Sequence, residues 1–247
     1  MDVGYDGLKF FVESIEDFAR GAFLEGIDVE LHRPMGGYVS YPTSYSCISY
    51  DLGRVPCNHE VFVERLKLMG YEESVKVWTY GIDTLRYGEH MGSLEDVSPE
   101  SISVLVQEGS FPYSSWALPT VDQGLEPSGD PFLAKAARKD GMTEAAFLVL
   151  PDLLEFVRKH GTPVPQLYQR ALRGYTFSGL KVAKWVAKDA DALLASLSKL
   201  THSTGLCGLK RVEIAGVHDS LYDVKSALAE ANFKPVCCTT ILSKELA

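Results

Sequence analysis

The sequence has few cysteines, no long hydrophobic run and no glycine-rich phosphate loop, and each absence excludes a class of protein. Five cysteines in 247 residues, two of them adjacent at Cys237 and Cys238, predict reduced thiols rather than a disulfide framework. No stretch approaches the 18 consecutive apolar residues typical of a transmembrane helix, so we expect no membrane partner. Neither a Walker-type loop nor a G-x-G-x-x-G motif occurs, which excludes the common nucleotide-binding loops.

Signatures of metal binding, catalysis and export are also missing. There is no C-x-x-C, H-x-x-x-H or G-x-S-x-G motif, and Cys47, Cys57 and His59 supply one ligand fewer than the four of a structural zinc site. We therefore expect no metal and no cofactor. The first residues, 1–6, contain two acids and no basic stretch before an apolar one, which argues against a signal peptide. With the reduced thiols, this predicts a cytoplasmic protein.

Charge is unevenly distributed along an otherwise ordinary composition. Hydrophobic residues make up 46% and charged residues 23%, as in soluble globular proteins, and the net charge is −9. Residues 1–170 carry 14 basic and 26 acidic side chains, whereas residues 171–247 carry 10 and 7. The asymmetry indicates an acidic part and a basic part with different partners, or simply a well-solvated acidic half.

Local patterns predict an α/β or α+β protein with mixed sheets and packed helices. Apolar spacing and turn residues predict the following elements in the first two thirds: helices at 10–25, 58–69, 132–139 and 153–160, strands at 27–31, 74–80 and 102–106, and two strands around a turn within 36–50. The run 145–150 fits a strand or a helix equally. The last third predicts a compact strand–helix–strand–helix–strand unit: 180–186, 190–200, 211–217, a helix to Asn232 that starts with a capping box at Ser220–Asp223, and 236–242.

A segment rich in proline and glycine divides the chain. Residues 111–129 are predicted to form a loop or linker, because these residue types interrupt both helices and strands. This places an acidic α+β N-terminal domain at 1–110. A helical segment followed by an α/β C-terminal domain is expected at 130–247.

One stretch, residues 170–188, interleaves basic and aromatic side chains. RNA and single-stranded nucleic acids are bound by rings that stack on bases and by cations that meet phosphates. The candidate contacts are Arg173, Tyr175, Phe177, Lys181, Lys184, Trp185 and Lys188. The alternative is an ordinary strand with one apolar face (Leu180, Val182, Val186) and a solvated basic face.

The candidate catalytic residues are His218 and Asp219. They follow a predicted strand, and the ends of strands are where α/β folds gather functional groups. A histidine there can exchange a proton near neutral pH. The competing interpretation is that Asp219 and Ser220 belong to the start of the next helix.

The main functional hypothesis from the sequence is an intracellular, non-catalytic binding or regulatory protein that acts through protein–protein contacts. It depends on the scarcity of catalytic motifs and on the uneven charge. One alternative is an RNA-binding protein that uses residues 170–188. Another is a small-molecule transferase or hydrolase with its site near His218, so the sequence leaves open whether the chain is an enzyme.

Overall fold

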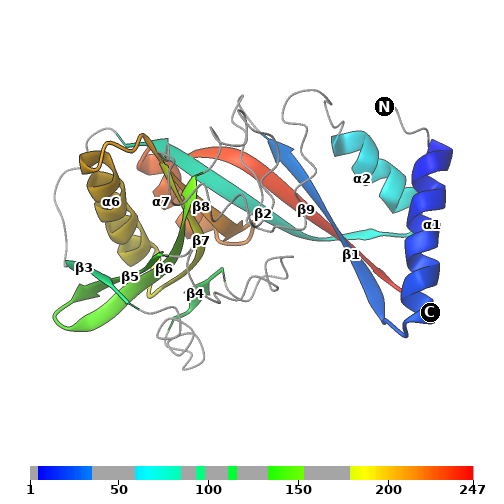
Figure 1. The fold of residues 1–247 in the computed structure, drawn as a ribbon, viewed down its shortest axis with the longest axis horizontal. Helices are drawn as coiled ribbons and strands as arrows, with labels where there is room; N and C mark the ends of the chain where they lie inside the picture. The colour runs from blue at the N-terminus through cyan, green and yellow to red at the C-terminus, as the bar shows by residue number, and fades with distance from the viewer. Residues whose placement is uncertain are drawn as a thin grey trace, which may run out of the picture.

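One mixed β-sheet organises the molecule, with helices gathered at its two ends (Figure 1). The computed structural model describes residues 5–34, 59–84, 93–97, 111–115, 133–152 and 179–246. Its sheet has nine strands, of which eight follow the order β1-β9-β2-β8-β7-β6-β5-β3, while β4 pairs with β7 outside that path. The predicted class, mixed α/β, is confirmed.

In the N-terminal part, the described residues form α1 (Tyr5–Gly21), β1 (Gly26–Pro34), α2 (His59–Leu68) and β2 (Glu72–Asp83). Helix α1 buries Val12, Glu16 and Ala19 and keeps its other side in solvent. The carboxylate of buried Glu16 is satisfied by Lys244, whose Nζ donates to both Glu16 oxygens at 2.9 and 3.0 Å. This ion pair joins the first helix to the last strand.

The described residues of the central part form four strands: β3 (Ser93–Asp96), β4 (Tyr113–Ser114), β5 (Leu133–Lys139) and β6 (Met142–Asp152). The predicted helix at 132–139 is wrong, although its Ala and Lys residues favour helices. Asp140 and Gly141 both have positive φ and close a tight hairpin between β5 and β6, so cross-strand pairing overrides helix propensity. The ambiguous run 145–150 lies in β6, a strand whose residues 145–149 are buried.

The C-terminal part has the predicted strand–helix–strand–helix–strand order: β7 (Gly179–Ala187), α6 (Ala190–Leu206), β8 (Arg211–His218), α7 (Tyr222–Glu230) and β9 (Lys234–Glu245). The predicted capping box is not formed. Leu221 is the N-cap of α7, and its apolar side chain offers no capping oxygen. The Asp223 carboxylate accepts the N–H of its neighbour Val224.

Strand β2 lies between β8 and β9 and is antiparallel to both. Strands from the two predicted domains therefore alternate within one sheet, and the division at 111–129 stays a prediction. The predicted elements at 36–50, 102–106 and 153–160 lie outside the described residues.

Helices α6 and α7 cover one face of the sheet over β6, β7 and β8, and the largest core cluster lies between them (Figure 1). Leu193 and Leu197 of α6 and Leu228 of α7 pack there against Trp185 and Ile214 of the strands. No helix in the described part of the chain is long and apolar enough to cross a membrane.

Replacing Gly179 by alanine is expected to destabilise the protein by about 1–3 kcal/mol, the usual cost of overpacking. An added Cβ would lie 2.2 Å from the carbonyl oxygen of Arg211, where β7 and β8 begin to pair. Urea unfolding measures the effect. In the control, Gly21→Ala at the end of α1, the added Cβ has no atom within 4 Å, so no loss is expected. Equal stability of Gly179→Ala and wild type would contradict this close approach.

Candidate functional site

Two parallel strands diverge at the centre of the sheet. Strands β7 and β8 pair from Gly179 to Val182 and from Arg211 to Ile214, and both continue without pairing to each other beyond those residues. We call this divergence the splay. Ligands of open α/β sheets bind outside the carboxyl ends of parallel strands, at a change of strand order, so the splay is the candidate site.

A β-bulge faces the splay. Val149 of β6 pairs with Val182, and the preceding residue, Leu148, pairs with Lys184, so Ala183 has no partner in that register or in the register with β8. Bulges leave the backbone groups of the extra residue outside the ladder and are frequent beside active sites. A backbone N–H that no strand uses can stabilise a negatively charged oxygen in a reaction.

Trp185 bridges the two diverging strands. Its side chain is fully buried, and its indole N–H donates to the carbonyl oxygen of Ala215 in β8 at 2.8 Å. Ala215 lies just beyond the last residue of β8 that pairs with β7, so the indole satisfies an acceptor that the splay removes from the ladder. The tryptophan therefore fixes the width of the splay on the helix side.

Strand β4 runs along β7 inside the splay. Tyr113 and Ser114 pair with Ala187 and Val186, and β6 already occupies the opposite edge of these two residues through Ala145 and Ala146. The edge that β4 uses is therefore the one that faces β8. This short strand lies beside β7 in Figure 1.

Side chains fasten β4 in place. The N–H of Ser115 donates to the carbonyl of Trp185 at 3.0 Å, and the N–H of Trp185 donates to Ser115 Oγ at 2.8 Å. Across the splay, the hydroxyl of Tyr113 donates to Asp223 in the first turn of α7. That hydrogen bond raises the pKa of Tyr113 and lowers the pKa of Asp223.

The N-terminus of α6, at the carboxyl end of β7, does not fit an anion. Helix N-termini bind phosphate through free backbone N–H groups. Here the Asp189 carboxylate caps the helix and accepts the N–H of Ala192 at 2.7 Å, and Asp191 adds a second acid in the first turn. Two carboxylates repel a phosphate at this place.

The predicted catalytic pair lies at the end of β8. The side-chain Nδ1 of His218 is 2.6 Å from Ser220 Oγ and accepts the Ser220 N–H at 3.1 Å. Asp219 accepts from Lys225 Nζ at 2.7 Å and from Trp78 Nε1 at 2.8 Å. Its pKa lies below the usual value, first because of the Lys225 hydrogen bond and then because of Trp78. Asp219 is thus a fixed carboxylate.

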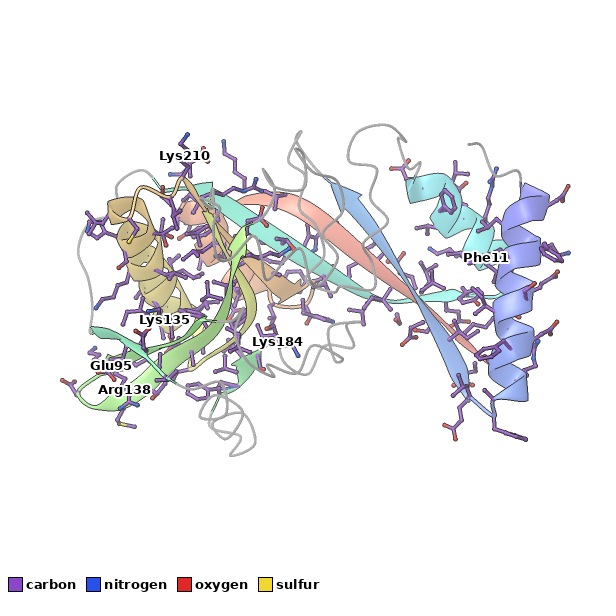
Figure 2. All side chains as sticks on the ribbon, viewed as in Figure 1. Phe11, Glu95, Lys135, Arg138, Lys184 and Lys210 are labelled. Carbon is purple, nitrogen blue, oxygen red and sulfur yellow. The ribbon has the colours of Figure 1, made fainter. Side chains whose placement is uncertain are left out.

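The structure separates the predicted nucleic-acid contacts. Arg173, Tyr175 and Phe177 lie outside the described residues. Lys181 is buried beside Glu213, with 3.9 Å between Nζ and Oε2, and Trp185 is fully buried, so neither presents a surface to a nucleic acid. Lys184, marked in Figure 2, is half-buried, and Lys188 is exposed, 3.7 Å from the Glu144 carboxylate.

Sequence reasoning missed the residues that attach β4 beside the splay. Tyr113, Ser115 and Asp223 come from a short strand in a proline-rich segment and from a helix start, and no motif links them. One signal was available for Asp189, because an acid directly before an apolar helix predicts an N-cap. No group of three or more His, Cys, Asp or Glu residues suited to a metal ion occurs within the described ranges.

The fold itself has known counterparts. No protein-family model matches the chain, and no curated protein is similar to it in sequence. Solved structures with this type of mixed α/β fold include GCN5-related N-acetyltransferases.

Three solved structures illustrate the likeness. A GCN5-related N-acetyltransferase from Sphaerobacter thermophilus has a TM-score of 0.57 at 13% identity, over 100% of this chain and 69% of its own. A functionally unknown conserved protein from Staphylococcus epidermidis ATCC 12228 has a TM-score of 0.55 at 10% identity, over 98% and 81%. A probable N-acyltransferase from Enterococcus faecalis V583 has a TM-score of 0.51 at 9% identity, over 99% of this chain and 50% of its own.

These neighbours overturn the main hypothesis from the sequence. A non-catalytic regulatory protein that acts through protein–protein contacts is the wrong expectation, because the structures that share the fold include a GCN5-related N-acetyltransferase and a probable N-acyltransferase. The error came from treating missing motifs as missing catalysis. A site built from a bulge and from the divergence of two strands leaves no motif in the sequence.

Proposed function

We propose that the chain is a small-molecule transferase that moves an acyl group onto an amine. The observation that carries the proposal is the bulge at Ala183, which leaves backbone groups outside the ladder where β7 and β8 diverge. The names of the structural neighbours, N-acetyltransferase and probable N-acyltransferase, support the same chemistry.

The chemistry needs an oxyanion site and a proton donor. An amine attacks the acyl carbon of a thioester, the new C–N bond forms, the C–S bond breaks, and the net proton transfer is from nitrogen to sulfur. We assign the stabilisation of the oxyanion to backbone N–H groups at the bulge of Ala183. We assign proton donation to His218, whose Nδ1 accepts from Ser220, so that the neutral ring carries its proton on Nε2.

The donor we propose is an acyl thioester with an extended, amide-bearing arm, recognised through that arm. The acids Asp189 and Asp191 at the start of α6 do not fit the phosphates of acetyl-coenzyme A. We therefore assign recognition to the backbone edge of β7 rather than to this helix terminus. Cys207 forms no disulfide within the described residues, which supports a reducing, cytoplasmic setting as part of the proposal.

The experiment measures thiol release from S-acetylpantetheine and from acetyl-coenzyme A with a panel of primary amines. We expect both donors to react with similar kcat/KM, because the phosphates gain no favourable contact at α6. His218→Ala is expected to lower kcat about 100-fold, the usual contribution of general acid catalysis. The matched control is His202→Ala, in α6, which should leave kcat unchanged.

Two results would count against the proposal. Absence of thiol release from either donor with every amine would remove the acyl-transferase function. Equal kcat for His218→Ala and His202→Ala would remove the role of His218 alone.

A further inference from the structure

The edge of β7 to which we assign donor recognition is already occupied by β4. An extended, amide-bearing ligand binds a sheet by adding to an open strand edge through backbone hydrogen bonds. In this chain Tyr113 and Ser114 take that position against Ala187 and Val186, on the side that faces β8. A ligand and β4 therefore compete for the same backbone groups.

Contacts at both ends hold β4 on this edge. At one end, Ser115 and Trp185 exchange hydrogen bonds through Ser115 Oγ and both backbones, at 2.8 and 3.0 Å. At the other end, the Tyr113 hydroxyl reaches Asp223 of α7, which belongs to the far side of the splay. The segment is thus attached both to the strand it pairs with and to the helix that follows β8.

The attachment is nevertheless short. Strand β4 has two residues, and only Ser115 is buried among the five described residues of this segment. A segment that pairs through two residues and buries only one of its five described residues belongs to the part of a structure that opens at low free energy. These bonds are therefore of the kind that a ligand can replace.

We infer that residues Phe111–Ser115 form an internal strap that occupies the β8-facing edge of β7, and that an acyl donor binds only after displacing it. The inference rests on the proposed function for the identity of the donor. If the competent, strap-released state is a minor one, the observed affinity is reduced by its population. The strap then lowers the affinity for the donor without touching the reacting atoms.

The test compares wild type with Tyr113→Phe/Ser115→Ala, which removes both side-chain attachments. S-acetylpantetheine is the probe, and two quantities are measured: the KM for the donor and the hydrogen exchange of the amide of residue 115, which bonds the Trp185 carbonyl in wild type. We expect the double variant to lower KM about tenfold with kcat unchanged, and to exchange this amide about tenfold faster. Adding the donor to wild type should also accelerate exchange at residue 115.

The control is Tyr222→Phe, which removes a hydroxyl from an exposed tyrosine at the start of α7 and should change neither quantity. If the double variant does not fold, Tyr113→Phe alone gives the same comparison with a smaller shift. The strap inference would be wrong if the double variant had an unchanged KM for the donor while its residue 115 amide exchanged faster. It would also be wrong if the donor slowed exchange of this amide in wild type. If no variant shows turnover, the proposed function is wrong, and the strap has no role against this donor. If the enzymes are active but KM is unchanged in the double variant, only the strap inference is wrong.

Discussion

Trp185→Ala is expected to destabilise the protein by about 3–5 kcal/mol, the range for truncation of a large buried aromatic side chain. Trp185 is fully buried, because it packs in the main core between β7 and α6. Its loss leaves a cavity and also an unpaired carbonyl at Ala215. Urea unfolding monitored by circular dichroism measures the change.

Trp185→Phe separates the two contributions. The phenyl ring keeps much of the volume but cannot donate, so the buried Ala215 oxygen loses its partner, which costs about 1–3 kcal/mol. If Trp185→Phe were as stable as wild type, the indole bond would not hold the splay. If Trp185→Ala also stayed within 1 kcal/mol, the packing described for this core would be wrong.

Lys244→Met is expected to cost about 3 kcal/mol at pH 7, as for removal of one partner from a buried ion pair. Lys244 Nζ donates to both Glu16 oxygens and to the Met69 carbonyl at 2.8 Å, and the Glu16 side chain is 5% exposed. The variant leaves Glu16 with Arg20, which is 3.3 Å away and half-exposed. Methionine keeps the apolar stem, so the loss reports the charge.

The cost of Lys244→Met should shrink as the solution becomes acidic. Burial alone would raise the pKa of Glu16, but the hydrogen bonds and charge of Lys244 outweigh it and hold the pKa below its usual value. The stabilisation is therefore complete above the unfolded value of about 4.3, and it is lost as the pH falls through the native pKa. Unfolding free energies of both proteins between pH 3 and 7 measure this convergence.

Lys9→Met is the matched control for that series. Lys9 also forms an ion pair from α1, with 3.7 Å between its Nζ and Glu13, but both side chains are at least half-exposed. An exposed pair contributes about 0–1 kcal/mol, so little change is expected at any pH. A constant difference between Lys244→Met and wild type from pH 3 to 7 would show that Glu16 is not the group that titrates.

The sequence predicted the last third of the fold well because that part is built from local patterns. Strand–helix–strand–helix–strand follows from apolar spacing and from residues that end helices, such as Asn232 with its positive φ. The prediction of a helix at 132–139 was wrong because this segment pairs with β6, and pairing between strands cannot be read from local spacing. The Asp140–Gly141 pair is a hairpin signal that could have corrected it.

Of the candidate site, only the residues at the end of β8 were predicted from the sequence. His218 and Asp219 follow from the rule that functional groups gather at strand ends, and their catalytic role stays a prediction. The bulge at Ala183 and the pairing of Tyr113 with Ala187 depend on which strands meet and in which register. Residues 74 positions apart in the chain carry no periodicity that reveals such a meeting.

The position of β2 between β8 and β9 also has a consequence for biosynthesis. Strand β2 ends at Asp83, and its two neighbours start at Arg211 and Lys234, more than a hundred residues later. During synthesis on the ribosome, β2 emerges long before β8 and β9 have been made, so neither of its edges has its native partner strand in that interval. Closing such distant pairs is slow, so this sheet is completed only after β9 has been synthesised, and chaperones that shield strand edges would act in that interval.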